Sequence, residues 1–394
     1  MHIQEKNYHG KTTLIRVDFN VPMKAGKITD NARMVAALPS IKKVIQDGGK
    51  AILMSHLGRP KGEKKSEFSL KPLAEELNVL MGLPVHFVDD CIGPEVEQKV
   101  QQTAFGEILL LENLRFYPQE KKGDKAFAQS LAYLADEYVN DAFGTAHRAH
   151  ASTSVVAQFF EGKKAFGYLM AKEIENAEKI LQTPQKPFVA IMGGAKVSDK
   201  IAIIENLLPL VDHLIIGGGM AYTFLKALGG EIGNSLLEED RLELCQTILS
   251  KAKERQVQIH LPEDSLVANA FSEEADKKIV NSMEIPEAYM GLDIGPKAIE
   301  SYAKVIQSAQ TILWNGPMGV FEMESYEKGT LELAVSIAKQ TERGAYALIG
   351  GGDSAAAIKQ LGYEEKVSYV STGGGALLSY FEGKGLPGVQ AILE

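Results

Sequence analysis

Cysteine is almost absent from this chain, and the sequence has no long hydrophobic run. The only two cysteines, Cys91 and Cys245, are far apart, which excludes a disulfide framework and a zinc-cluster spacing. No apolar stretch approaches the roughly 20 residues that span a bilayer, and the opening segment MHIQEKNYHGK lacks the apolar core of a signal peptide. We therefore expect a soluble, cytoplasmic protein with no membrane partner.

Excess positive charge and the common nucleotide-binding signatures are also missing. With 42 basic and 51 acidic residues the formal net charge is -9, which disfavours a nucleic-acid partner, because such proteins are usually basic. GKT at 10–12 lacks the upstream glycine of a P-loop. No GxGxxG with an acidic partner supports a nicotinamide fold. His56, His147 and His150 lack a metal-ligand spacing.

Short apolar runs alternate with stretches of helical periodicity along the whole chain of 394 residues. Continuous rather than alternating apolar strands indicate parallel sheets covered on both faces. The predicted strands fall near 12–19, 50–55, 85–89, 107–112, 137–141, 187–192, 212–217, 257–261, 310–314, 345–350 and 367–371. The pattern predicts the α/β class, with two doubly wound, Rossmann-like parallel-sheet domains joined by a connecting helix and hinge.

The junction is expected where a helical stretch, LMAKEIENAEKILQ at 169–182, meets the proline-flanked segment TPQKP. We therefore expect a first domain over 1–170, a connecting helix and hinge over 171–186, a second domain over 187–380 and a C-terminal segment over 381–394. That last segment, FEGKGLPGVQAILE, contains Gly383, Gly385, Pro387 and Gly388, which favour an irregular strap.

Arginine is concentrated in the first half. Five of the eight arginines lie there, and all but Arg33 lie beside the end of a predicted strand: Arg16, Arg33, Arg59, Arg115 and Arg148. Arginine suits bidentate recognition of phosphate and carboxylate, and ligands of doubly wound sheets bind beyond the carboxyl ends of the strands. Any one of these side chains is more often a plain surface charge. Five in one half of the chain, four of them beside strand ends, predict a polyanion site.

Glycine clusters mark the second half, each directly after an apolar strand. They are Gly193-Gly194, Gly217-Gly218-Gly219, Gly350-Gly351-Gly352 and Gly373-Gly374-Gly375, and Asn315-Gly316-Pro317 follows the strand that contains the single tryptophan. Glycine at such a point lets the backbone approach a ligand, and the following helix offers N–H groups to phosphate. Tight turns also require glycine, so a single cluster is weak evidence for a ligand site. The repeated pattern predicts a nucleotide crevice.

These segments, taken in order, resemble the phosphoglycerate kinase family from end to end. The matching blocks are RVDFNVP (16–22), SHLGRP (55–60), LLENLRF (110–116), VNDAFGTAHRAHAST (139–153), GGAKVSDK (193–200), IIGGGMAYTF (215–224), LLEED (236–240), WNGPMGVFE (314–322), GGGDSAAA (350–357) and STGGGA (371–376). The resemblance implies that 1,3-bisphosphoglycerate and ADP are converted reversibly to 3-phosphoglycerate and ATP, a glycolytic step, with Mg²⁺.

By position, the resemblance implies two sets of site residues. The triose set is Asp18, Asn20, Arg33, His56, Leu57, Gly58, Arg59, Arg115 and Arg148. The nucleotide set is Gly194, Ala195, Lys200, Gly217, Gly218, Gly291, Asn315, Pro317, Glu322, Gly350, Gly351, Gly352, Asp353 and Ser354. Lys196 matches the lysine that accompanies the transferred phosphoryl group. We expect a monomer that acts on small molecules.

Phosphoryl transfer needs positioning and charge stabilisation more than covalent work by the protein. We expect Arg33 and Lys196 to supply positive charge, and the N–H groups of Gly373, Gly374 and Gly375 to face the moving phosphoryl, in direct in-line transfer within a closed cleft between the domains. An acyl phosphate and a carboxylate exchange without a proton, so the histidines are expected to be hydrogen-bond donors or structural residues rather than acid–base catalysts.

Some alternatives stay open. Asp353 suits Mg²⁺, but from its place before a helix it could equally be an N-cap, and only the resemblance favours the metal. The chain could be another acyl-phosphate or carboxylate kinase on a two-lobed scaffold. It could also be a catalytically silent binding module, although Lys196, Arg33 and Asp353 are all present.

Overall fold

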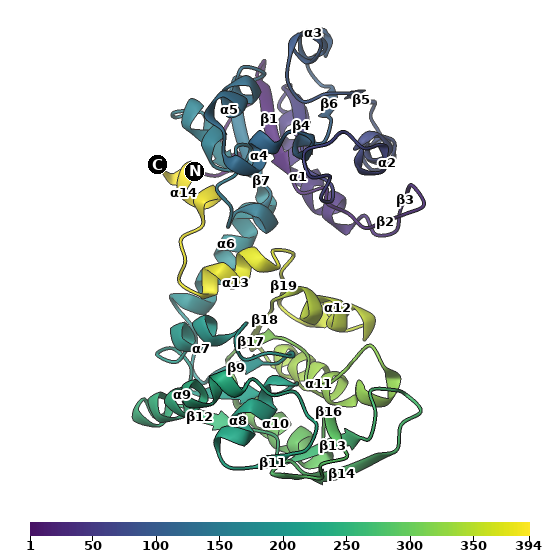
Figure 1. Ribbon diagram of the computed structural model, residues 1–394. Helices are drawn as coiled ribbons and strands as arrows, with labels where there is room; N and C mark the ends of the chain where they lie inside the picture. The colour runs from purple at the N-terminus through teal and green to yellow at the C-terminus, as the bar shows by residue number, and fades with distance from the viewer. The chain divides into compact units, whose positions relative to one another are not determined.

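The computed structural model describes residues 1–394, which form two compact units (Figure 1). The first unit comprises Met1–Glu175 together with Gly385–Glu394, and the second comprises Asn176–Lys384. Each unit has its own parallel sheet and its own buried core, so each is described by itself.

The first unit is built on a six-stranded parallel sheet with strand order β5-β6-β4-β1-β7-β8. Its strands are β1 (Thr12–Val17), β4 (Lys50–Met54), β5 (Val85–Val88), β6 (Ile108–Leu111), β7 (Glu137–Asp141) and β8 (Lys164–Phe166). Every residue of β4 and β6 is buried, as continuous apolar runs predict for strands covered on both faces. The predicted α/β class is confirmed. Strand β8 was missed because its three residues are too few to show a period.

Helices cover both faces of this sheet. They are α1 (Ala32–Gln46), α2 (Lys71–Met81), α3 (Pro94–Gln102), α4 (Pro118–Lys122), α5 (Lys125–Ala132) and the start of α6 (Tyr168–Leu181), which runs on into the second unit. The buried stripe of α1, which includes Met34, Ala37 and Ile41, lies in one core with Ile15 and Leu53 of the sheet. A small hairpin, β2 (Met23–Lys24) and β3 (Lys27–Ile28), precedes α1.

The C-terminal segment differs from the expected irregular strap. After α13 (Gly375–Phe381), residues 387–393 form a helix, α14 (Pro387–Leu393), whose Val389 and Ile392 are buried. Gly388 binds the end of β7 and its loop: its N–H donates to Ala146 O at 2.9 Å, and its carbonyl accepts from Asn140 Nδ2 at 3.3 Å. Proline fits the first helical position, where its missing N–H costs nothing. The strap prediction was therefore wrong for 387–393.

The second unit has a six-stranded parallel sheet with order β12-β10-β9-β17-β18-β19. Its strands are β9 (Phe188–Met192), β10 (His213–Ile216), β12 (Gln258–His260), β17 (Thr311–Asn315), β18 (Tyr346–Ile349) and β19 (Tyr369–Val370). The chain runs outward from β9 in one direction and from β17 in the other. A topological switch point therefore lies between these two strands, and it is where such sheets bind ligands.

The helices of this unit pack around its sheet and around an antiparallel insert that was not predicted. Besides the end of α6, the helices are α7 (Ile201–Leu207), α8 (Met220–Ala227), α9 (Leu242–Glu254), α10 (Pro296–Ser308), α11 (Lys328–Glu342), α12 (Gly352–Gln360) and α13. The insert consists of β13 (Asp264–Ala268), β14 (Lys277–Asn281) and β16 (Met290–Ile294), with the short pair β11 (Glu231–Ile232) and β15 (Glu284–Ile285). No helix of the protein combines the length and the apolarity that crossing a bilayer requires.

Candidate active site

The predicted triose residues gather at the carboxyl edge of the first sheet. The loop after β1 brings Asp18 close to Arg33 of α1, with Arg33 Nη1 2.9 Å from Asp18 Oδ2. His56, which follows β4, has its Nδ1 4.0 Å from Asp18 Oδ1. Arg115 lies in a short 3-10 helix after β6 (Leu114–Phe116), and Arg148 follows β7. Four strand ends thus contribute to one basic cluster.

Gly58 joins two of these segments through its backbone. Its N–H donates to Asn20 Oδ1 at 2.9 Å, and its carbonyl accepts from Arg115 Nη1 at 2.7 Å. The turn has φ +60°, and a Cβ here would lie 2.4 Å from the Phe68 ring, so only glycine fits. The next residue, Arg59, is exposed.

Leu57 has a structural part in this turn. Its N–H and its carbonyl are both bonded to the Asn113 amide, at 3.2 and 2.8 Å, and its side chain is buried in the core. The resemblance placed Leu57 among the substrate-binding residues, but its contacts are those of a support for Gly58.

The basic cluster keeps its histidines neutral. Burial, followed by the charges of Arg16, Arg115 and Arg33, holds the pKa of His56 well below its usual range. Burial with the same kind of repulsion lowers the pKa of His150 to about 3. Neutral imidazoles at physiological pH agree with the expectation that these rings donate hydrogen bonds rather than protons.

Arg115 has one hydrogen-bond donor without a partner. Burial, with repulsion from Arg16 and Arg148, lowers its pKa to about 10, so it remains a cation at neutral pH. Its Nε is buried and has no hydrogen-bond partner. An unsatisfied buried donor is costly, and an anionic oxygen would satisfy it. The first unit therefore offers a site for a strongly anionic ligand.

A cavity of about 490 Å³ lies in the second unit near the switch point. Its walls come from the loops after β9, β10 and β17 and from the antiparallel insert. The lining residues are Gly194, Ala195, Gly218, Gly219, Tyr222, Asn234, Leu236, Phe271, Met290, Gly291, Leu292, Pro317, Met318, Gly319, Val320, Glu322 and Asp353. A mostly apolar cavity of this size with a few polar groups at one side suits a nucleotide.

Glycine lets the loop after β9 and the loop after β17 approach each other closely at this cavity. A Cβ on Gly316 would lie 2.1 Å from Gly193 O, and Gly316 has φ +101°. Ser354 Oγ accepts from Gly316 N–H at 2.6 Å, and Asn315 Nδ2 donates to Gly350 O at 2.7 Å. The strand ends are therefore fastened to one another.

Several predicted nucleotide residues lie among these strand-end contacts and do not line the cavity. Lys200 Nζ donates to Asn315 Oδ1, and burial lowers the pKa of Lys200. The predicted residues outside the cavity lining are Lys200, Gly217, Asn315, Gly350, Gly351, Gly352 and Ser354.

The apolar wall was missed from the sequence. Leu236, Phe271, Met290 and Val320 line the cavity without belonging to the predicted set. One signal was available: Phe271 stands in the polar stretch ANAFSEE, and its side chain is 60% exposed. Single exposed apolar side chains are common on protein surfaces, so this signal alone would not have marked a site.

Asp353 is exposed in the first turn of α12, and the N-cap of that helix is Gly351. The N-cap alternative is therefore wrong. No group of three or more His, Cys, Asp or Glu side chains forms a cage for a metal ion. Mg²⁺ is commonly held by one or two carboxylates together with nucleotide phosphates, and Asp353 and Glu322 on the same cavity fit that donor set.

The glycine-rich segment before α13 offers fewer donors than expected. The Gly373 N–H donates to Ser371 Oγ at 3.0 Å, whereas Gly374 takes φ +49° and caps α13. Lys196 is exposed in the loop between β9 and α7.

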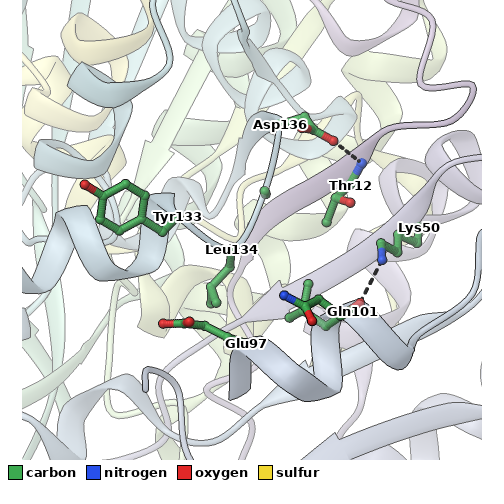
Figure 2. A pocket seen from close by; sticks show the side chains of 9 residues that line it. Thr12, Lys50, Glu97, Gln101, Tyr133, Leu134 and Asp136 are labelled. Carbon is green, nitrogen blue, oxygen red and sulfur yellow. Dashed lines mark hydrogen bonds between the residues drawn. The ribbon is translucent and has the colours of Figure 1, made fainter. Parts of the chain in front are cut away.

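Another cavity of about 470 Å³ lies at the opposite, amino-terminal edge of the first sheet (Figure 2). Lys50 on its wall is buried, and its ammonium donates to Val100 O at 2.7 Å and Thr103 O at 3.1 Å. The Asp136 carboxylate accepts from Thr12 N–H at 2.9 Å. Lys50 and Asp136 are thus hydrogen-bonded, and the cavity lies at the opposite edge of the sheet from the candidate site.

Comparison with known proteins decides the family. The family model described as phosphoglycerate kinase matches residues 3–384. The chain belongs to the phosphoglycerate kinase family. It is 52% identical to the phosphoglycerate kinase of Moorella thermoacetica over 392 residues, covering 100% of this chain and 98% of that protein. The Porphyromonas gingivalis phosphoglycerate kinase is 49% identical, with 100% of both chains covered.

Solved phosphoglycerate kinase structures share the fold. The Coxiella burnetii phosphoglycerate kinase matches with TM-score 0.91 and 42% identity, covering 100% of this chain and 98% of that one. The Pyrococcus horikoshii phosphoglycerate kinase matches with TM-score 0.84 and 32% identity over the same shares.

Proposed function

We propose that this chain catalyses the reversible transfer of the acyl phosphate of 1,3-bisphosphoglycerate to ADP, which yields 3-phosphoglycerate and ATP. The observation that carries this proposal is the phosphoglycerate kinase family match over residues 3–384. It agrees with the separate chemistry of the two units, a basic cluster in one and a mostly apolar cavity with glycine-rich loops in the other.

The triose substrate binds at the basic cluster. Arg33, Arg59, Arg115 and Arg148 neutralise its phosphate and carboxylate, because guanidinium groups match both geometries. Asp18, Asn20 and His56 orient the substrate and its arginines, and Gly58 holds Asn20 and Arg115 in place.

The nucleotide binds in the cavity of the second unit, with its base against the apolar wall and its phosphates towards Gly194, Gly218 and Pro317. Asp353 would hold Mg²⁺ through the nucleotide phosphates. Magnesium bound there would neutralise phosphate charge.

Transfer is direct and in line. Arg33 and Lys196 stabilise charge on the moving phosphoryl, and backbone N–H groups at Gly374 and Gly375 assist, with Gly373 shaping the turn. No general base is needed, because the attacking oxygen carries no proton. Reacting atoms must come within about 3–3.5 Å, so two ligands held by separate units require closure.

A coupled assay with 3-phosphoglycerate, ATP and Mg²⁺ tests this function. We expect turnover with 3-phosphoglycerate and none with acetate. Activity with acetate alone would indicate another carboxylate kinase, and binding of both ligands without turnover would indicate a silent module. We also propose a cytoplasmic monomer, which light scattering of the purified protein and fractionation of its host cells would check.

A further inference from the structure

Beneath the basic cluster lies a chain of buried polar side chains that has no assigned role. Arg16, at the end of β1, is 1% exposed, and Glu120, on α4, is fully buried. Arg16 Nε donates to Ser152 Oγ at 2.9 Å, and Ser152 Oγ donates in turn to Glu120 Oε1 at 2.6 Å. Ser152 N–H also donates to Glu120 Oε2 at 3.0 Å. The serine therefore bridges a buried cation and a buried carboxyl group.

The other end of the chain reaches His56. Arg16 Nη2 lies 3.1 Å from His56 Nδ1, and Arg16 Nη1 donates to the carbonyl of Val17. A guanidinium group has no acceptor and stays protonated, so in this pair His56 Nδ1 must be the acceptor. A neutral imidazole that accepts at Nδ1 carries its proton on Nε2.

The competing partner of His56 is weaker. Asp18 Oδ1 would favour the opposite tautomer, with the proton on Nδ1, but it lies 4.0 Å away, beyond hydrogen-bonding distance. Burial and the charge of Arg16 hold the pKa of His56 well below its usual range. The ring therefore stays neutral and carries its single proton on one of its two nitrogens.

We propose that Arg16, held by Ser152 and Glu120, is a positioning residue that fixes His56 in its Nε2–H tautomer and so presents a neutral hydrogen-bond donor to the triose substrate. This inference rests on the proposed place of His56 in the triose site. The network also joins the four strand-end segments that carry the site: Arg16 near the end of β1, His56 after β4, Glu120 after Arg115, and Ser152 after Arg148 and His150.

Both buried charges support this reading. Burial raises the pKa of Glu120, and the charge of Arg16 opposes that shift through the serine bridge. Removing either partner leaves the other buried and unpaired, which is strongly unfavourable. Variants at these positions therefore test both folding and positioning, and the two effects need separate readouts.

The decisive measurement is long-range ¹H–¹⁵N correlation of the imidazole nitrogens in the ligand-free, full-length protein. The eight histidines are resolved by comparison with His56→Asn, which removes one set of signals. We expect the wild-type His56 ring to be neutral with its proton on Nε2. A ring with its proton on Nδ1 would overturn the inference, and this result requires no variant to fold.

Arg16→Met should convert His56 to the other tautomer or to a mixture, and it should raise KM for 3-phosphoglycerate by on the order of 10- to 100-fold with a smaller change in the KM for ATP. Lys50→Met is the matched control, because it also replaces a buried cation of the first unit but lies at the opposite edge of the sheet (Figure 2). It should leave the His56 signals unchanged. An unchanged tautomer in folded Arg16→Met would rule out the positioning role.

If Arg16→Met does not fold, Ser152→Ala cuts the bridge and keeps both charges, and a smaller rise in the same KM is expected. His56→Gln should retain more affinity for 3-phosphoglycerate than His56→Asn, because its amide nitrogen reaches the place of Nε2. Equal losses in both would count against an Nε2 donor. If the His56 signals of the wild type do not change when 3-phosphoglycerate is added, the proposed triose site is contradicted. That outcome is separate from the tautomer measured without ligand.

Discussion

Arg33 Nη1 donates a hydrogen bond to Asp18 Oδ2 across 2.9 Å and so fastens the first turn of α1 to the loop after β1. The Asp18 side chain is 9% exposed and the Arg33 side chain is 39% exposed. The pair therefore lies at the surface of the basic cluster, with Asp18 on the inner side. Asp18 therefore sets the direction of the guanidinium group before substrate arrives.

Arg33→Lys should lower kcat by about 100-fold or more while leaving the circular dichroism spectrum unchanged. Lysine can keep the ion pair with Asp18, but its single ammonium cannot also serve two phosphoryl oxygens as the planar fork does. Steady-state kinetics measure this effect, with the exposed Arg255→Lys as control. Wild-type turnover in folded Arg33→Lys would remove Arg33 from the transfer step.

Lys196→Ala should reduce kcat more than it raises KM for ATP. A group that acts on the transferring phosphoryl stabilises the transition state more than the bound nucleotide. Initial rates at varied ATP separate the two effects, and Lys251→Ala, which breaks only a surface pair with Glu205, should change neither. Loss of nucleotide affinity with kcat preserved would assign Lys196 to ground-state binding.

Phe271→Ala should raise KM for ATP by roughly fivefold to 100-fold with kcat nearly unchanged, since contact between an aromatic ring and a base contributes about 1–3 kcal/mol. The side chain lines the cavity and is 60% exposed in the free protein. Phe105→Ala is the matched control, because Phe105 is 56% exposed and belongs to the first unit. Equal KM values for the two variants would contradict the apolar wall as the nucleobase site.

Asp293 should make the stability of the second unit depend on pH. Burial raises its pKa from 3.8 to about 7, against backbone hydrogen bonds from Gly329 and Ile294 that favour its charged form. The pKa of Asp293 is higher in the folded state than in the unfolded state. Its contribution to the free energy of unfolding is therefore fully present below about pH 4 and is lost as the pH rises through about 7. A shift of this size corresponds to about 4 kcal/mol.

Fluorescence of the single tryptophan, Trp314, measures this effect, because it is fully buried in the second unit. We expect the free energy of unfolding of the wild type, relative to Asp293→Asn, to fall between about pH 4 and pH 7. The asparagine variant cannot ionise at this position, so its own stability should lack that pH dependence. A difference that is flat over that range would mean that Asp293 ionises normally.

Small-angle scattering should show the smallest radius of gyration when both substrates are bound. The proposed triose and nucleotide sites belong to different units, and in-line transfer needs the two ligands in contact. The free protein, the two binary complexes and the ternary complex are compared. One unchanged radius in all four states would exclude closure.

The strands and the glycine-rich turns were predictable because their signals are local. Runs such as TTLIRV and FVAIM are almost entirely buried, and burial on both faces favours the apolar residues that dominate them. Gly316 was singled out because it directly follows an apolar strand, whereas Gly58 was named only through the family resemblance.

The tertiary structure alone decided which of these side chains contact one another and which line the cavity. Leu57 and Lys200 lie in family motifs, yet their hydrogen bonds are to Asn113 and Asn315. Phe271 reaches the cavity from an insert about 50 residues beyond the nearest predicted glycine cluster. The sequence by itself determined the strands of the two parallel sheets other than β8, and its motifs carried the family resemblance. The pairing of Arg16 with His56 required the fold, because side chains 40 positions apart meet only once parallel strands align their carboxyl ends.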